Sequence, residues 1–88
     1  MDLSIIIVSY NTKELLELCL KSLKEATENL KAEIFVVDNN SIDDTISMVR
    51  KNFPDVLLTE NSQNLGFSKA NNQSLKKASA KYILVLNP

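Results

Sequence analysis

The sequence predicts an α/β fold in which four parallel strands form one sheet and three helices cross over between them. Two observations predict it. Four short apolar runs are nearly continuous in Ile, Val and Leu, and the segments between these runs have helical periodicity. Such alternation gives right-handed crossovers and hence half of a doubly wound, Rossmann-like sheet with the strand order 3-2-1-4. We expect one domain over residues 1–88.

The four strands are expected where the apolar runs lie. A strand with one buried face alternates apolar and polar residues, whereas these runs do not alternate, which is typical of a parallel sheet covered on both faces. The predicted ranges are Leu3–Val8, Ile34–Val37, Val56–Leu58 and Tyr82–Leu86.

The first helix follows the first strand. We expect Asn11 to cap it, with Glu14 three residues on completing a variant of the reciprocal capping arrangement. Apolar residues recur at three- and four-residue steps, so one side of this helix should pack on the sheet. The stripe comprises Leu15, Leu16, Cys19, Leu20, Leu23, Ala26 and Leu30. Its position on the stripe predicts that Cys19 is a buried structural thiol.

The second and third helices are shorter. Ser41, followed by Asp44, is expected to cap the second helix, and Pro54 should stop it. Its inner face is predicted to consist of Ile46, Val49 and Phe53. The third helix is expected from about residue 67 to residue 80, with Phe67, Ala70, Leu75 and Ala78 on its buried side.

Composition excludes several classes of function. Ten basic and eleven acidic residues are spread along the chain, so we expect neither nucleic acid nor an anionic membrane as a partner. The apolar runs, such as Ile5–Val8, are too short for a membrane span, and no signal pattern begins the chain. We therefore expect a cytoplasmic chain, with membrane association left open for a full-length protein. With no histidine and one cysteine, neither a zinc cluster nor a His-based triad is possible.

Polar, amide-rich residues follow every predicted strand. In an open parallel sheet, ligands bind beyond the carboxyl ends of the strands, so these residues should share one edge. Singly, each asparagine is also explained as a helix cap or turn residue. The eight asparagines concerned are Asn11, Asn39, Asn40, Asn61, Asn64, Asn71, Asn72 and Asn87.

Their chemistry suits a nucleotide. Each amide offers donors and an acceptor, Asp38 adds an acceptor for the imide N–H of a uracil or for the N–H groups of another base, and Tyr10 adds a face for stacking. The turn after the first strand has no glycine, and no Gly-Lys-Ser/Thr sequence is present. These absences argue against NAD binding and against ATP hydrolysis.

Four motifs in order resemble glycosyltransferase family two, in its rhamnosyltransferase-like branch. They are SIIIVSYN at Ser4–Asn11, EIFVVDNNS at Glu33–Ser41, ENSQNLGF at Glu60–Phe67 followed by Asn71 and Asn72, and YILVLNP at Tyr82–Pro88. The resemblance covers essentially the whole chain. It implies the N-terminal half of a GT-A fold, which binds the nucleotide of a nucleotide-diphosphate sugar donor linked to UDP, GDP or dTDP.

The resemblance also implies roles for residues. Ser9, Tyr10 and Asn11 would flank the base, and Asp38 with Asn39 would read its edge. Asn40 and Ser41 would complete that turn. On the ribose and diphosphate side, the resemblance places Asn64, Gly66 and Asn71. Where relatives have small residues and glycines, this sequence has Ser68, Lys69 and Ala70, of which Lys69 could supply a charge to the diphosphate.

The family follows Asn-Pro with an acidic DxD-type motif that holds Mg²⁺ or Mn²⁺, whereas this sequence ends at Pro88. We therefore expect a chain truncated before that motif, with no metal ligand, no cofactor and no catalytic residue of its own. It should be inactive alone, with glycosyl transfer to an acceptor only in the full-length protein.

Two alternatives remain. In the first, the chain is a non-catalytic structural or interaction module of the same fold, which forms homo-oligomers through the exposed edge Tyr82–Leu86. The second is a phospho-acceptor receiver domain, which is disfavoured because that domain needs acidic residues after the first strand and a phosphorylatable Asp after the third.

Overall fold

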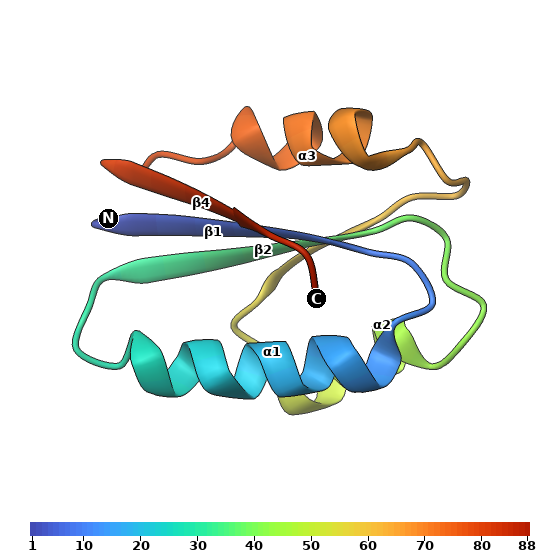
Figure 1. Ribbon diagram of the computed structural model, residues 1–88, viewed down its shortest axis with the longest axis horizontal. Helices are drawn as coiled ribbons and strands as arrows, with labels where there is room; N and C mark the ends of the chain where they lie inside the picture. The colour runs from blue at the N-terminus through green and yellow to red at the C-terminus, as the bar shows by residue number, and fades with distance from the viewer.

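The computed structural model describes residues 1–88 as three layers, with one parallel sheet between helices (Figure 1). The sheet order is β3-β2-β1-β4 and all neighbouring strands run parallel, which confirms the predicted fold and strand order. In chain order the elements are β1 Leu3–Ser9, α1 Lys13–Ala26, β2 Ala32–Asp38, α2 Thr45–Asn52, β3 Leu57–Glu60, α3 Phe67–Leu75 and β4 Tyr82–Leu86.

The register brings the strand ends level. Ser9 at the end of β1 pairs with Asp38 at the end of β2, and Asp38 pairs with Glu60 at the end of β3. Parallel strands place their carboxyl ends at the same edge. The turns that follow these three strands therefore gather at one end of the molecule, at the right in Figure 1.

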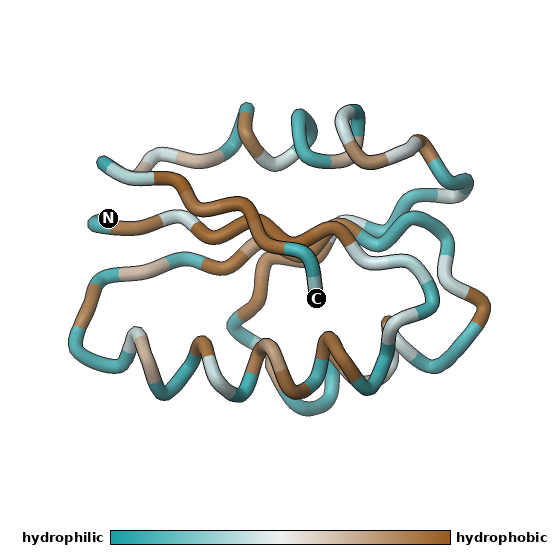
Figure 2. Tube along the Cα trace, viewed as in Figure 1, coloured by the Kyte–Doolittle hydropathy of each residue, from teal (hydrophilic) through white to brown (hydrophobic).

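The main core lies between the sheet and the helix pair α1 and α2. Ile5, Ile7 and Val36 from the sheet pack with Leu16 and Leu20 of α1, and the cluster is completed by Met48, Val49 and Phe53. Figure 2 shows the apolar strands running through the middle of the molecule. Burying such side chains stabilises each by about 1.5–3 kcal/mol relative to exposure. This cluster is therefore the principal source of stability.

Helix α1 begins later and ends earlier than predicted. Its first residue is Lys13 and its N-cap position is Thr12, because Asn11 has a left-handed φ of 53° that cannot start a helix. After Ala26 the chain turns, and the Thr27 hydroxyl donates to the Leu23 carbonyl at 2.7 Å. Leu15, Ala26 and Leu30 are exposed, although the stripe had included them.

Helix α2 is capped differently from the prediction. Asp44 occupies the N-cap position, and the first helical N–H, that of Thr45, is donated to Asp43 Oδ1 at 3.1 Å. Ser41 lies upstream and bonds Asp38 instead. The helix ends at Asn52, before Pro54, as predicted, but its buried residues are Thr45, Met48 and Val49, with Ile46 only half-buried.

Helix α3 covers the opposite face of the sheet alone. It ends at Leu75 in a turn in which the N–H groups of Lys77 and Ala78 are both donated to the Ser74 carbonyl. Phe67 and Leu75 are exposed, contrary to the prediction. Ala70 is buried as predicted, and the helix also buries Asn71 and Ser74. This second layer is thinner and more polar than the main core.

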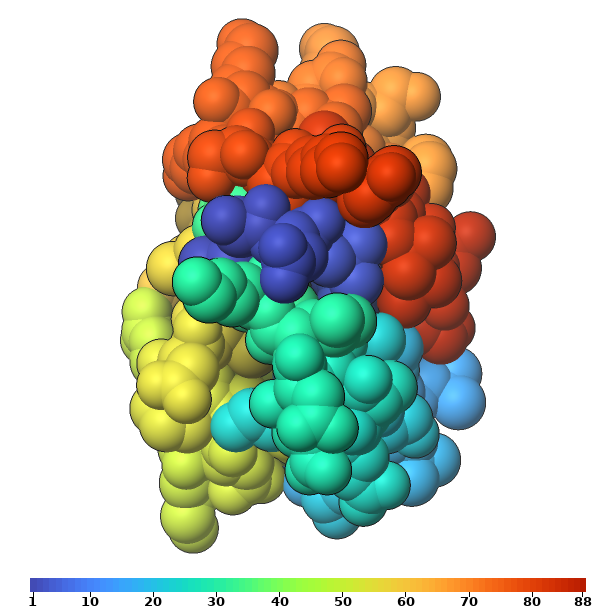
Figure 3. Space-filling view, turned by 90° about the vertical axis from the view of Figure 1, so that its left-hand side faces the viewer, coloured from blue at the N-terminus to red at the C-terminus, as the bar shows by residue number.

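Strand β4 is an edge strand, paired only with β1. Tyr82, Ile83, Leu84 and Val85 are between 41% and 64% exposed. Figure 3 shows β4, in red, at the margin of the sheet below α3. An apolar edge therefore faces the solvent. None of the helices has the length and hydropathy needed to cross a bilayer.

Candidate functional site

The candidate site is the rim formed by the turns after β1, β2 and β3 and by the start of α3. We define the rim by Ser9–Asn11, Asp38–Ser41, Asn61, Asn64 and Gly66. Strand register places Ser9 beside Asp38, and the Asn39 N–H is donated to the Ser9 carbonyl at 2.8 Å. The sheet thus delivers these residues to a common edge, as the sequence predicted.

Asp38 is a buried member of the rim. It is 2% exposed, and Ser41 bonds both of its oxygens: the Ser41 N–H is donated to Oδ2 at 2.8 Å and the hydroxyl to Oδ1 at 2.6 Å. Each carboxylate oxygen has room for a second bond. Asp38 first stabilises its own turn, and two of its four acceptor sites are not used by Ser41.

Asn11 links the turn after β1 to the turn after β2. Its backbone N–H is donated to Ser41 Oγ at 2.9 Å, and its side-chain Oδ1 accepts the Ile42 N–H at 2.8 Å. Asn is one of the residues that tolerate the left-handed region, which explains the choice at this corner. Asn11 thus holds the turn after β1 against the turn after β2.

A second network of amides holds the loop between β3 and α3. Asn39 Nδ2 donates to the Gly66 carbonyl at 3.2 Å, and Asn39 Oδ1 accepts from Asn61 at 3.0 Å. Asn61 and Gln73 exchange two bonds of 2.9 Å each. Sequence reasoning missed Gln73, whose signal is its place on the helix that follows an amide-rich turn. The Nδ2 and Oδ1 atoms of Asn39 are therefore both hydrogen-bonded to protein groups.

Five rim residues are exposed, namely Tyr10, Asn11, Asn40, Asn64 and Gly66. Tyr10 is 48% exposed, and Asn40, which has a left-handed φ of 68°, is exposed and makes no side-chain hydrogen bond. Asn64 is also exposed, and its Oδ1 accepts the Gly66 N–H at 2.8 Å. Gly66 has a φ of 81°, a conformation that favours glycine. These groups are among the most exposed parts of the rim.

Asn71 lies apart from the turns, in the second turn of α3. It is 7% exposed, and its Oδ1 has no hydrogen-bond partner. Lys69, in the first turn of the same helix, is exposed and makes no ion pair. The structure therefore places Asn71 under the helix and Lys69 on its surface.

A carboxylate next to the rim is stabilised by hydrogen bonds. Asp43 lies beside it, and the hydroxyl of Thr45 donates to its carboxylate, as do the backbone N–H groups of Thr45 and Lys13. These bonds, led by that of the Thr45 hydroxyl, lower the pKa of Asp43 below its ordinary 3.8. Away from the rim, Cys19 is partly buried against the core and not fully buried as predicted, and this burial raises the pKa of its thiol.

The residues present do not fit a bound metal ion. Mg²⁺ and Mn²⁺ prefer several carboxylate oxygens, and no group of three or more His, Cys, Asp or Glu side chains occurs. The one carboxylate within the rim, Asp38, already accepts two bonds from Ser41. We therefore derive no step through a metal in these residues.

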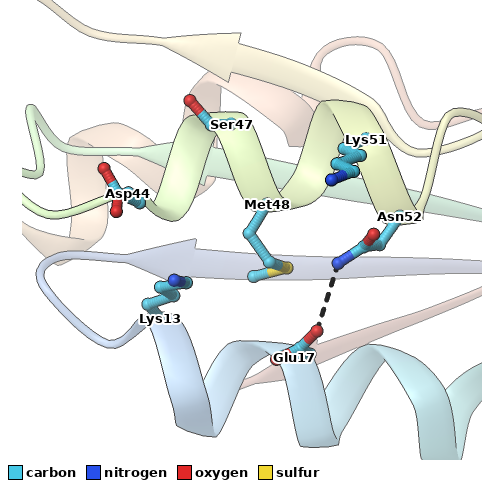
Figure 4. A pocket seen from close by; sticks show the side chains of 7 residues that line it. All are labelled: Lys13, Glu17, Asp44, Ser47, Met48, Lys51 and Asn52. Atoms are coloured by element: carbon cyan, nitrogen blue, oxygen red, sulfur yellow. Dashed lines mark hydrogen bonds between the residues drawn. The ribbon is translucent and has the colours of Figure 1, made fainter.

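The cavities of the molecule lie elsewhere. One of about 320 Å³ lies between α1 and α2, where Met48 forms the floor and Asn52 bonds Glu17 at 3.2 Å (Figure 4). The other two lie along β3 and at the beginning of β2. None is lined by a residue predicted to bind nucleotide. The rim is thus a surface and not an enclosed pocket.

The fold and the strand-end rim together define a Rossmann-like domain of the GT-A kind. The model of Glycosyl transferase family 2 matches residues 4–88. The chain belongs to glycosyltransferase family 2.

Similar proteins agree with this assignment. The glycosyltransferase SunS of Bacillus subtilis is 31% identical over 81 residues, which cover 92% of this chain. The mannosyltransferase PcManGT from Pyrobaculum calidifontis, solved with GDP-Man and Mn²⁺, is 30% identical, with a TM-score of 0.82 over 97% of this chain. S. aureus TarS, solved in complex with UDP, is 29% identical, with a TM-score of 0.85 over 99% of this chain.

The chain spans only a part of each of these proteins. It covers 18% of SunS, 26% of the PcManGT chain and 27% of the TarS chain.

Proposed function

We propose that residues 1–88 are the nucleotide-sugar-binding portion of a glycosyltransferase and that the rim binds the nucleotide of the sugar donor. The observation that carries the proposal is that Ser9 and Asp38 are paired at the ends of neighbouring strands. The exposed ring of Tyr10 follows directly after Ser9. A stacking face beside a carboxylate acceptor suits a nucleobase. The TarS and PcManGT structures, which contain UDP and GDP-Man, support the ligand class.

Each rim residue has a role in this proposal. Tyr10 stacks on the base, Asp38 accepts an N–H from its edge, and Asn40 contributes an unpaired amide. Asn11 and Asn39 hold the two turns, because their amide groups are bonded within the protein. Asn64 and Gly66 are assigned to the ribose and diphosphate side, together with Asn71 under α3, and Lys69 is the nearby positive charge. No side chain is assigned a catalytic role.

Glycosyl transfer itself is proposed for a full-length family protein. A divalent metal, where bound, neutralises charge on the departing diphosphate. PcManGT was solved with Mn²⁺, which supports metal use in the family. Because residues 1–88 form no carboxylate cluster, we assign them donor binding alone.

A titration with UDP, GDP and dTDP, followed by NMR, tests the proposal. We expect shifts at Tyr10, Asp38 and Asn64 with at least one nucleotide. Tyr10→Ala should weaken its binding about tenfold, because stacking of one base on an aromatic ring contributes about 1–3 kcal/mol. Tyr82→Ala, on the far edge strand, is the matched control and should leave the affinity unchanged. Binding that causes no shift at these three residues, or no binding at millimolar nucleotide, would refute the proposal.

A second candidate function rests on β4. Its apolar side chains are about half exposed and its outer backbone groups lack a strand partner, which favours pairing with another chain. In this proposal the domain is an interaction module that forms homo-oligomers through Tyr82–Leu86. Light scattering at tens of micromolar should detect a dimer or larger species, and a monomer at that concentration would rule the proposal out.

A further inference from the structure

Ser41 occupies a central position in the rim that its sequence neighbours do not share. Its hydroxyl accepts the backbone N–H of Asn11 at 2.9 Å and donates to Asp38 Oδ1 at 2.6 Å. Its own backbone N–H is donated to the other oxygen, Oδ2, at 2.8 Å. One residue therefore contacts both carboxylate oxygens of Asp38 and the turn that carries Tyr10.

These bonds use the proton of the hydroxyl and one of its two lone pairs. A serine hydroxyl has one proton to donate, and here Asp38 receives it, while one lone pair takes the Asn11 N–H. A hydroxyl that accepts one bond and donates another strengthens both, since linked hydrogen bonds polarise one another. The orientation of the carboxylate and the position of the Tyr10–Asn11 corner are thus coupled through a single oxygen.

The remaining lone pairs of Asp38 have a fixed direction as a result. Two of its four acceptor sites are used by Ser41, and the carboxylate is 2% exposed, so it cannot turn freely. The Ser41 side chain itself is only half-buried, so it can be changed without opening the core.

From this geometry we infer that Ser41 is a positioning residue for base recognition: it aims Asp38 at the imide N–H of a bound uracil and sets that acceptor against the stacking face of Tyr10. The inference rests on the proposed function, because it deepens the account of the same rim. Ser41 acts through Asp38 and Tyr10.

The test compares two ligands and three variants. UDP presents an imide N–H, whereas N3-methyl-UDP carries a methyl group in its place. Ser41→Ala removes the hydroxyl, Ser41→Thr retains it, and Ser47→Ala changes an exposed serine of α2 that makes no side-chain hydrogen bond. Dissociation constants are measured by calorimetry or NMR, and the amide spectrum of each variant confirms that it folds.

Ser41→Ala should weaken UDP about tenfold, which corresponds to about 1.4 kcal/mol. It should leave the already weaker N3-methyl-UDP unchanged, because that ligand has no N–H for Asp38 to accept. Ser41→Thr should restore most of the UDP affinity, and Ser47→Ala should match the wild type.

A purely structural role for Ser41 would weaken both ligands by the same factor, and that result would overturn the inference while leaving the proposed function intact. Equal binding of UDP and N3-methyl-UDP by the wild-type protein would also overturn it. If the wild-type protein binds none of the three nucleotides UDP, GDP and dTDP, the proposed function itself fails, and the inference fails with it.

Discussion

At the scale of single residues, side chains that bond backbone groups connect the turn after β1 to the turn after β2. Asn11 accepts the Ile42 N–H, and Asp43 accepts the first helical N–H groups of both α1 and α2, those of Lys13 and Thr45. Helix starts carry unsatisfied N–H groups and a partial positive charge, so a carboxylate there is favourable. One aspartate thus stabilises two helix starts.

Asp43 makes the stability of the protein depend on pH. Its pKa is lowered in the folded state, so its contribution is complete above its ordinary pKa of 3.8 and is lost as pH falls through the folded value. Urea unfolding at a series of pH values below about 5 should show a weaker loss of stability in Asp43→Asn than in the wild type. Asp44→Asn is the control, since Asp44 makes no side-chain hydrogen bond. Identical pH profiles for Asp43→Asn and wild type would contradict the assignment.

Asn11 and Asn40 offer a matched pair of left-handed residues. Their φ values are 53° and 68°, but the Asn11 side chain accepts a hydrogen bond and that of Asn40 does not. Glycine relieves the left-handed strain at both positions. We expect Asn11→Gly to destabilise the fold by about 1 kcal/mol through the lost bond to Ile42, and Asn40→Gly to be neutral or slightly stabilising. Chemical denaturation measures both, and equal effects would show that the Asn11 bond contributes nothing.

At the scale of elements, the two faces of the sheet are packed differently. α1 and α2 bury large apolar side chains against one face, whereas α3 buries Ala70, Asn71 and Ser74 against the other. Asn71 Oδ1 and the Ser74 hydroxyl have no hydrogen-bond partner. A buried polar group without a partner costs about 1–3 kcal/mol. α3 is therefore the less stable layer.

Two buried serines, one in α3 and one in β1, allow the packing of α3 to be tested. Ser74→Ala removes a hydroxyl that has no partner and adds a better helix former, so the free energy of unfolding should rise by up to about 1 kcal/mol. Ser9→Ala removes a hydroxyl that bonds Thr12 Oγ1 at 3.0 Å and should lower it by about 1 kcal/mol. Thermal or urea unfolding of the two variants measures the contrast. A Ser74→Ala variant less stable than the wild type would show that the hydroxyl has a partner.

Sequence patterns predicted the apolar strands correctly. They missed the positions at which polar residues are buried. The strands were found because Ile5–Ile7 and Phe35–Val37 are buried on both faces and leave an uninterrupted signal. The buried side of α3 was missed because Asn71 and Ser74 do not register as apolar, and Phe67 and Leu75 do. The caps were misplaced because Asn11 and Ser41 bond across turns about thirty residues apart, which no local pattern encodes. The rim could be predicted from parallel topology; the partners of its amides could not.

At the scale of the whole molecule, helices cover the two faces of the sheet, but its two edges are open (Figure 1). The domain measures 34 × 25 × 18 Å, and the sheet is closed by backbone pairing on neither edge. At the β4 edge the exposed side chains are apolar, from Tyr82 to Val85. A chain of this size buries only about 60–65% of its unfolded surface, so additional burial at this edge would raise stability appreciably.

Association through β4 should make thermal stability depend on concentration. If the interaction module proposed above is correct, a tenfold rise in protein concentration should raise the wild-type Tm by about 3–6 °C, because the folded state alone associates. Val85→Lys places a charge on the edge and should abolish that dependence. Ser47→Lys, which adds the same charge on α2, should retain it. Differential scanning calorimetry at two concentrations decides, and a concentration-independent wild-type Tm would argue against the module.

The central place of β1 in the sheet determines when its pairing can be completed during synthesis. Of these four strands β1 is translated before the other three, and its two neighbours are β2 and β4, so Leu3 pairs with both Ala32 and Tyr82. The nascent chain must keep the run Ile5–Ile7 from premature association while more than seventy further residues are translated. This places the domain among those whose sheet closes only late in synthesis, and its apolar first strand is the segment that a ribosome-bound chaperone would have to shield.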